Sequence, residues 1–189
     1  MADTKRPQTP RDAWAAMVAG NHRFVTGDPA HPRQDIDMRT ALAEQQRPFA
    51  ALFGCADSRL SAEIIFDVGL GDLFVVRNAG QVIGETILGS LEYSVEVLGV
   101  PLILVLGHDE CGAIRATLDD IAGNLTADGR FIHHLVDQIR PTVLEANAAG
   151  KTDIDDVTEW HVQDTINEML TKSKTISDAV KAGKLGVVG

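Results

Sequence analysis

Two cysteines and one histidine stand in short motifs whose residue types suit a metal ion. Cys55 lies in the segment GCADSR, and Cys111 follows His108 in the segment GHDECG. Two thiolates and one imidazole match the three protein ligands of a zinc site whose fourth position is open. The alternative for each cysteine is a small buried hydrophobic side chain, and an isolated His-x-x-Cys is a weak signal. Their placement in the fold must decide between these readings.

Three short apolar runs predict strands that are buried on both faces, at residues 49–53, 73–76 and 102–106. Helical spacing of apolar residues at 86–98 and a shorter segment at 61–67 predict helices between them. This strand–helix order predicts right-handed crossovers and a parallel sheet. The fold class is therefore α/β, with a central, mostly parallel β-sheet flanked by helices.

The two motifs follow the first and the third predicted strand. In an open parallel sheet, ligands bind at the carboxyl ends of the strands, at a topological switch point. We therefore expect Cys55, His108 and Cys111 to converge there and to bind one zinc ion. In the cytoplasm, metal binding or catalysis is also a commoner use of two cysteines than a disulfide framework.

Asp57 and Arg59, two residues apart, can form a bidentate ion pair. The alternative to a functional role is a structural salt bridge. The charges of zinc, two thiolates and a neutral imidazole cancel, so Asp57 as a fourth ligand would make the site negative and fill the position that water needs. We predict that Arg59 competes with zinc for Asp57, and that the open site holds a water whose pKa falls from ~15.7 towards ~7.

The rest of the chain is predicted to be one domain, residues 1–189. A helix is expected at 10–26, with Thr9 as its N-cap, followed by an extended arm at 27–40 that lies on the main body or on a second subunit. Residues 1–40 thus form an N-terminal helix and arm. Helices are expected after Cys111 and at 157–182, before a final strand at 184–189.

Charge and hydropathy exclude several classes of partner. The net charge of −10 argues against nucleic acid and anionic membranes, which both need a basic face. The apolar runs are shorter than a membrane span, and the N-terminus lacks the apolar stretch of a secretory signal, so the predicted location is cytoplasmic. The remaining histidines are expected to be structural or solvated, with a proton shuttle as the alternative, namely His22, His31, His133, His134 and His161.

Together, Cys-x-Asp-x-Arg and the later His-x-x-Cys resemble the motifs of the β-class carbonic anhydrases. The resemblance begins in the first helix, at Trp14, Gly20, Asn21, Arg23 and Phe24, and covers most of the chain. It implies a subunit that dimerises through its N-terminal helix and sheet edge, or forms a tetramer. It also implies a zinc ion held by the two cysteines and the histidine. The family usually continues past Gly189 with another strand, so we expect the last strand to be cut short.

The resemblance also implies a pocket for carbon dioxide and bicarbonate, drawn from both subunits. Its residues here would be Gln46, Phe74, Ala79 and Tyr93. On pattern alone, Phe74 and Tyr93 could equally belong to the core, and Gln46 could be solvated.

The predicted reaction is reversible hydration of carbon dioxide by a zinc-bound hydroxide, gated by the Asp57–Arg59 pair. Asp57 would be either a fourth zinc ligand in a closed state or an acceptor for the zinc-bound water. One alternative is a carbon disulfide or carbonyl sulfide hydrolase on the same zinc site. The other is a zinc-stabilised binding module without catalysis, in which Asp57 stays on the metal.

Overall fold

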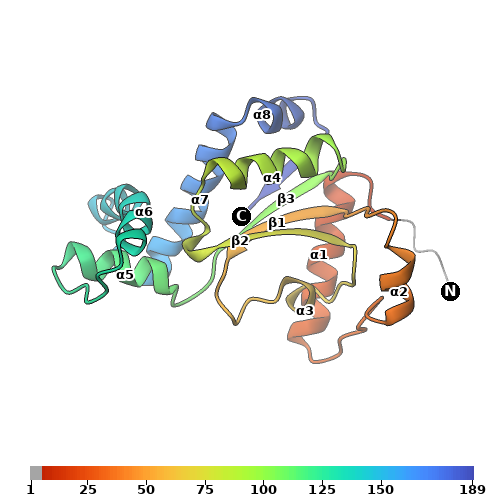
Figure 1. The fold of residues 1–189 in the computed structure, drawn as a ribbon, viewed down its shortest axis with the longest axis horizontal. Coiled ribbons are helices and arrows are strands. Elements are labelled where there is room, and N and C mark those ends of the chain that lie inside the picture. The colour runs from red at the N-terminus through yellow and green to blue at the C-terminus, as the bar shows by residue number, and fades with distance from the viewer. Residues whose placement is uncertain (1–5) are drawn as a thin grey trace.

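A computed structural model describes residues 6–189, and within them four strands form one parallel sheet in the order β2-β1-β3-β4 (Figure 1). The strands are β1 (Ala50–Cys55), β2 (Leu73–Asn78), β3 (Leu102–Leu106) and β4 (Gly186–Val188). Each neighbouring pair is parallel, with Leu52 opposite both Val75 and Leu104. The predicted α/β class and its parallel sheet are confirmed.

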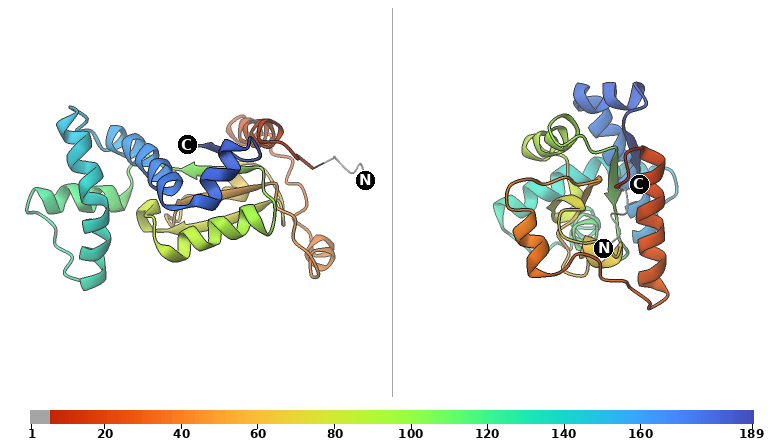
Figure 2. Two further views of the ribbon diagram at one scale, coloured as in Figure 1. Left: turned by 90° about the horizontal axis from the view of Figure 1, so that it is seen from above. Right: turned by 90° about the vertical axis from the view of Figure 1, so that its right-hand side faces the viewer.

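Alternate residues of the central strands pack on opposite faces of the sheet. Leu52 and Leu104 belong to one core, with Met17 of helix α1 (Pro10–Val25) and residues of helix α3 (Ala62–Ile65). Phe53 and Val105 belong to the other core, with Leu91 of helix α4 (Glu85–Glu96). Figures 1 and 2 show α1 and α4 on opposite sides of the strands. Because both faces are covered, the strands carry the continuous apolar runs expected of buried parallel strands.

Helix α1 begins as predicted, since the Thr9 hydroxyl accepts a hydrogen bond from the Asp12 amide. The helix lies very close to the segment after α3. A Cβ atom on Gly20 would stand 1.8 Å from the carbonyl oxygen of Phe66, so only glycine allows this approach. The Asn21 amide donates to the Ile65 carbonyl at 3.0 Å across the same contact.

The segment after α1 differs in part from the predicted extended arm. Ile36–Ala41 form a short helix, α2, whose N-cap is Asp35. The prediction of an extended arm over 27–40 was therefore wrong for its last part, because the capping side chain of Asp35 supplies a local helix start that outweighs the lack of apolar periodicity. The main body supports the preceding residues, since the amides of Ala30 and His31 donate to the Asp67 carboxylate.

The chain is helical after Cys111, as predicted, and forms two helices there. Helix α5 (Gly112–Ile121) and helix α6 (Arg130–Ala148) pack against each other, and Figure 2 shows that they project away from the sheet. Their shared core includes Ile114 and Ile139.

The long helical stretch predicted for 157–182 is broken into two helices. Helix α7 (Ile154–Lys172) ends at Ser173, and helix α8 (Lys174–Lys181) begins there. The Ser173 hydroxyl accepts a hydrogen bond from the Ile176 amide and donates one to the Glu92 carboxylate at 2.6 Å. Ser173, which is held by Glu92 of helix α4, thus caps a new helix at a point where the sequence predicted one continuous helical stretch.

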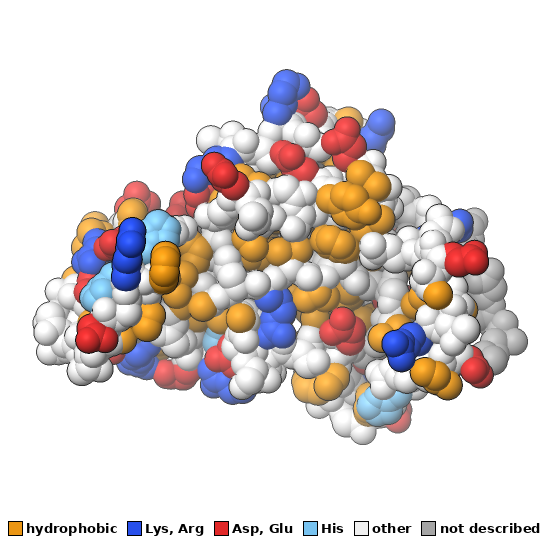
Figure 3. Space-filling model, viewed as in Figure 1, with side chains coloured by type: hydrophobic (Ala, Val, Ile, Leu, Met, Phe, Trp, Pro, Cys, Tyr) orange, Lys and Arg blue, Asp and Glu red, His pale blue; other side chains and the backbone are white. Residues whose placement is uncertain are grey.

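The final strand, β4, is confirmed and forms one edge of the sheet beside β3. Within residues 6–189, none of the helices is both long and apolar enough to cross a membrane. Acidic and basic side chains are interspersed over the face drawn in Figure 3.

Candidate metal centre

The three predicted metal ligands meet at the carboxyl edge of the sheet. Cys55 is the last residue of β1, His108 follows the end of β3, and Cys111 is the N-cap residue of α5. One possible ligand atom from each residue lies within 4.8 Å of the other two. The structure therefore brings together all three residues that the sequence predicted to converge.

These ligand atoms are enclosed by protein. Cys55 is 5% exposed and Cys111 is 1% exposed, and both belong to the core formed with α5 and α6. The His108 side chain is 7% exposed. The site is thus mostly shielded from water, which strengthens electrostatic interactions inside it.

The orientation of His108 leaves one ring nitrogen available. Its Nδ1 lies 2.9 Å from the Asp109 carbonyl oxygen, and since a carbonyl can only accept, Nδ1 must carry the proton. In the neutral ring, Nε2 then keeps its lone pair. Among residues 6–189, this buried Nε2 has no hydrogen-bond partner. A backbone carbonyl that fixes the ring tautomer in this way is typical of metal-binding histidines.

The two thiols interact strongly with each other. Hydrogen bonds from Cys111 and from backbone amides outweigh burial and lower the pKa of the Cys55 thiol. The hydrogen bond between the two thiols and burial raise the pKa of Cys111. One thiolate is therefore already stabilised, and the second proton must leave when a metal ion binds both sulfurs.

The donor set fits zinc. Two thiolates and one imidazole are ligands that Zn²⁺ prefers, and three protein ligands leave a fourth position for a reactant. One ring nitrogen of His108 and the two sulfurs lie within 4.8 Å of one another, and Nε2 is the ring nitrogen that has no hydrogen-bond partner among the described residues. The residues present thus fit a zinc ion with three protein ligands.

Asp57 and Arg59 form the predicted ion pair. The guanidinium Nε and Nη2 of Arg59 donate to the two carboxylate oxygens of Asp57, each at 2.9 Å. The Asp57 Oδ2 atom lies 4.0 Å from the Nε2 of His108, so the pair stands directly beside the candidate ligands. Hydrogen bonds from Arg59 hold the pKa of Asp57 well below its usual range, and the carboxylate is ionised at neutral pH.

Two further contacts connect the ligand-bearing segments. Arg59 Nη2 also donates to the Glu110 carbonyl at 3.3 Å, which links the first motif to the second. From β2, Arg77 donates to the carbonyls of Cys55 and Asp57, at 2.8 and 2.6 Å. The motifs in the sequence give Arg77 no role at the metal site. The signal that could have placed it there is its position at the carboxyl end of a neighbouring strand.

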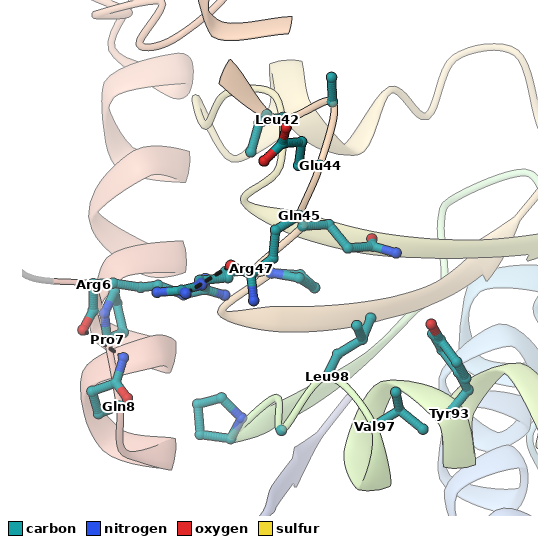
Figure 4. Close-up of a pocket in the computed structure, with 15 residues that line it drawn as sticks. Arg6, Pro7, Gln8, Leu42, Glu44, Gln45, Arg47, Tyr93, Val97 and Leu98 are labelled. Carbon is teal, nitrogen blue, oxygen red and sulfur yellow. Dashed lines mark hydrogen bonds between the residues drawn. The ribbon is translucent and has the colours of Figure 1, made fainter. Parts of the chain in front are cut away.

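The predicted substrate residues lie in two places. Gln46 and Tyr93 line a pocket of about 1310 Å³, and Figure 4 shows Tyr93 extending from α4 towards the strands. Pro48 and Pro101 line the same pocket and come just before β1 and β3, so it lies at the amino edge of the sheet. The five residue-to-residue steps of β1 from Ala50 to Cys55, at about 3.3 Å each, separate it from Cys55 by roughly 17 Å.

Phe74 and Ala79 mark the two ends of β2. The Phe74 ring lies near the amino end, with its centroid 6.1 Å from that of Tyr93. Ala79 follows the carboxyl end and is exposed next to Gly80, whose amide contacts Cys55. One chain by itself therefore does not gather these four residues around the candidate metal ligands.

Comparison with known proteins agrees with this geometry. Residues 50–189 match the family described as "Carbonic anhydrase". The chain is 48% identical over 180 residues to "Carbonic anhydrase 2" of Mycobacterium tuberculosis, covering 95% of this chain and 86% of that protein. It is 47% identical over 180 residues to the carbonic anhydrase of Mycolicibacterium smegmatis, covering 95% and 87%.

Solved structures of similar fold carry the same class name. The Coccomyxa β-carbonic anhydrase in complex with acetazolamide aligns with a TM-score of 0.64 at 26% identity, covering 90% of this chain and 79% of that one. A structure described as one of two tetrameric β-carbonic anhydrases from Sordaria macrospora shares the fold, with a TM-score of 0.65 at 22% identity, covering 93% and 89%.

This chain is an α/β subunit with a Cys–His–Cys cluster at the carboxyl edge of its parallel sheet. The chain belongs to the β-class carbonic anhydrase family and is an enzyme of that class. The resemblance inferred from its motifs is confirmed.

Proposed function

We propose that this chain catalyses reversible hydration of carbon dioxide to bicarbonate and a proton, at one zinc ion held by Cys55, His108 and Cys111. The observation that carries the proposal is the convergence of two buried thiols and an unpartnered imidazole nitrogen within 4.8 Å. Zinc, when bound, supplies Lewis-acid activation of water at neutral pH. The remaining steps depend on what the residues of the chain do around that position.

Asp57 and Arg59 control access to the fourth position in this proposal. Arg59 holds both oxygens of the Asp57 carboxylate, which keeps that carboxylate from moving the few ångströms to the candidate ligands. In this open arrangement the ionised Asp57 accepts a hydrogen bond from the reacting water. Release from Arg59 would let the carboxylate occupy the open position and stop turnover.

Substrate binding is proposed to need a second copy of the chain. Gln46 and Tyr93 line a pocket at the sheet edge opposite the metal ligands. Association of two subunits would place this pocket beside the metal centre of the other. Tyr93, Val97 and Leu98 give this otherwise polar pocket one apolar side, which suits carbon dioxide because this molecule has no charge and forms weak hydrogen bonds. The tetrameric assembly named for the Sordaria proteins supports self-association of this fold.

A stopped-flow assay of carbon dioxide hydration, with metal content measured on the same sample, tests the proposal. We expect turnover that is lost with a chelator and returns when zinc is added. Carbon disulfide and carbonyl sulfide serve as competing substrates. Turnover of these sulfur compounds without carbon dioxide hydration would contradict the proposed substrate. Stoichiometric zinc without any turnover would instead indicate a zinc-stabilised binding module.

A further inference from the structure

A buried histidine of helix α7 reaches the candidate metal centre through one glycine. The Nε2 atom of His161 lies 2.7 Å from the carbonyl oxygen of Gly80. The amide of the same glycine donates to the Cys55 sulfur at 3.4 Å. Gly80 lies in the short turn Ala79–Gln81 that directly follows β2. The sequence predicted a structural or solvated His161, with a proton shuttle as the alternative, whereas the structure connects this residue to a predicted metal ligand.

The protonation of His161 follows from its surroundings. His161 is 5% exposed, and burial lowers the pKa of its imidazole, so the ring is neutral at pH 7. Because the Gly80 carbonyl can only accept, Nε2 must be the protonated nitrogen. The ring therefore acts as a fixed donor towards the turn rather than as a group that exchanges protons with solvent.

The turn itself needs an external support. Gly80 has a φ of 71° and Gln81 a φ of 40°, two successive residues in the left-handed region. A Cβ atom on Gly80 would stand 2.8 Å from both Ala113 and Ile139, so a side chain does not fit there. Strained backbone of this kind persists only where surrounding contacts hold it. His161 supplies such a contact from a helix that is remote in the sequence.

We propose that His161 is a positioning residue for the metal site. By holding the Gly80 carbonyl, it restrains the backbone of the turn around the Gly80 Cα, and the Gly80 amide in this turn places and stabilises the Cys55 thiolate as a ligand. Contacts one step removed from a metal ligand typically change metal affinity 10- to 100-fold when they are lost. The inference rests on the proposed zinc site, but its test is metal affinity rather than turnover.

Three variants separate positioning from packing. In His161→Gln, the amide nitrogen reaches about as far as Nε2 and can still donate to Gly80. In His161→Asn, the side chain is one methylene shorter, so its amide nitrogen cannot reach the Gly80 carbonyl. Thr165→Val is the control, because Thr165 is also buried on α7 but its hydroxyl donates only to the carbonyl of His161 in its own helix.

Zinc affinity is measured by competition with a chelator for each folded protein, and cobalt replaces zinc to record the thiolate-to-metal charge-transfer absorption. We expect His161→Asn to bind zinc at least about 10-fold more weakly than wild type and to shift the absorption. His161→Gln and Thr165→Val are expected to stay within about threefold of wild type, a margin well below that loss.

Equal affinity and spectra in His161→Asn and wild type would overturn the inference. So would an equal loss in Thr165→Val, since that result would assign the effect to packing of α7. If His161→Asn does not fold, wild-type affinity and spectrum in His161→Gln support the inference, and a loss of affinity in this folded variant overturns it. A wild-type protein that binds no zinc would instead overturn the proposed function together with this inference.

Discussion

The guanidinium of Arg59 donates a hydrogen bond to each carboxylate oxygen of Asp57, at 2.9 Å, directly beside the imidazole of His108. The carboxylate lies close to the candidate metal ligands but is directed to a cation of its own chain. This relationship gives the gate a physical basis, because one carboxylate has two alternative partners. It also makes the gate testable by removing either member of the pair.

Arg59→Ala is expected to keep zinc but lose turnover from roughly pH 6 to roughly pH 9, a window around the expected zinc-water pKa. Without its cationic partner, Asp57 can occupy the open position. Asp57→Ala also loses the acceptor for the reacting water, but it cannot close the site, so water should occupy the fourth position even at lower pH and the remaining turnover should fall less towards acid than that of wild type. The measurement is a pH–rate profile for wild type and both variants at matched zinc content.

Wild-type activity should rise with pH across this window, because higher pH supplies hydroxide to compete with Asp57 for the open position. The pKa of Asp57 itself lies far below the window, so its titration does not cause the rise. Arg115→Ala is a matched control. Arg115 pairs with Glu110 nearby, and its substitution removes the same charge as Arg59→Ala does. A flat wild-type profile, or a fully active Arg59→Ala, would show that the pair is only a structural salt bridge.

Zinc content tests the ligand set directly. The purified protein should contain about one zinc per chain, as three-ligand catalytic sites do. Cys55→Ser and Cys111→Ser should both lose it, because a hydroxyl is a far poorer ligand than a thiolate. Elemental analysis gives the content, and circular dichroism checks that the variants are folded. Full zinc in both folded variants would show that the assigned ligands are wrong.

Self-association should depend on the outer face of α1. This helix buries Ala13 and Met17 against the sheet, yet Val18 and Val25 are 47% and 73% exposed. Val18→Glu should weaken association and lower activity on dilution, because the proposed pocket is shared between subunits. Sedimentation velocity measures the association.

Leu144→Glu, on the exposed side of α6, is the control for this substitution because Leu144 is 49% exposed. Deletion of residues 1–35 would also weaken association, but it removes Ala13 and Met17 from the core. The point substitution is therefore the sharper test. A fully active monomer would reject the shared pocket.

Acid should destabilise the fold through Asp67. Burial alone would raise its pKa, but the amides of Ala30 and His31 and the guanidinium of Arg23 outweigh it and lower the pKa to about 2. An unfolded aspartate has a pKa of about 3.9. The stabilisation is therefore complete above about pH 4 and is lost as the pH falls from there through about 2.

Asp67→Asn should lower the free energy of unfolding by about 2 kcal/mol at pH 7, the size of hydrogen bonds to a charged group. The difference from wild type should shrink as the pH falls below about 4. Urea unfolding at several pH values measures it. Asp28→Asn, an exposed aspartate after α1, is the control. If the free energies of unfolding of Asp67→Asn and wild type differed as much at low pH as at pH 7, Asp67 would not be the source of the acid sensitivity.

The sequence by itself determined the strands and the convergence of the three candidate metal ligands. Strands buried on both faces show continuous apolar runs, and in parallel sheets the residues after such runs gather at one edge. Cys55, His108 and Cys111 could therefore be placed together from local patterns alone. The start of α1 was predictable for the same reason, because the hydrogen bond between the Thr9 hydroxyl and the Asp12 amide lies within one helical turn.

The tertiary structure decided what depends on contacts between distant segments. His161 and Gly80 are 81 residues apart, and no local pattern relates a helix residue to a strained turn. The separation of Gln46 and Tyr93 from the metal ligands also depends on which edge of the sheet each segment reaches. Local patterns report burial and hydrogen bonding within a few residues, whereas such long-range pairs are fixed only when the helices pack onto the sheet.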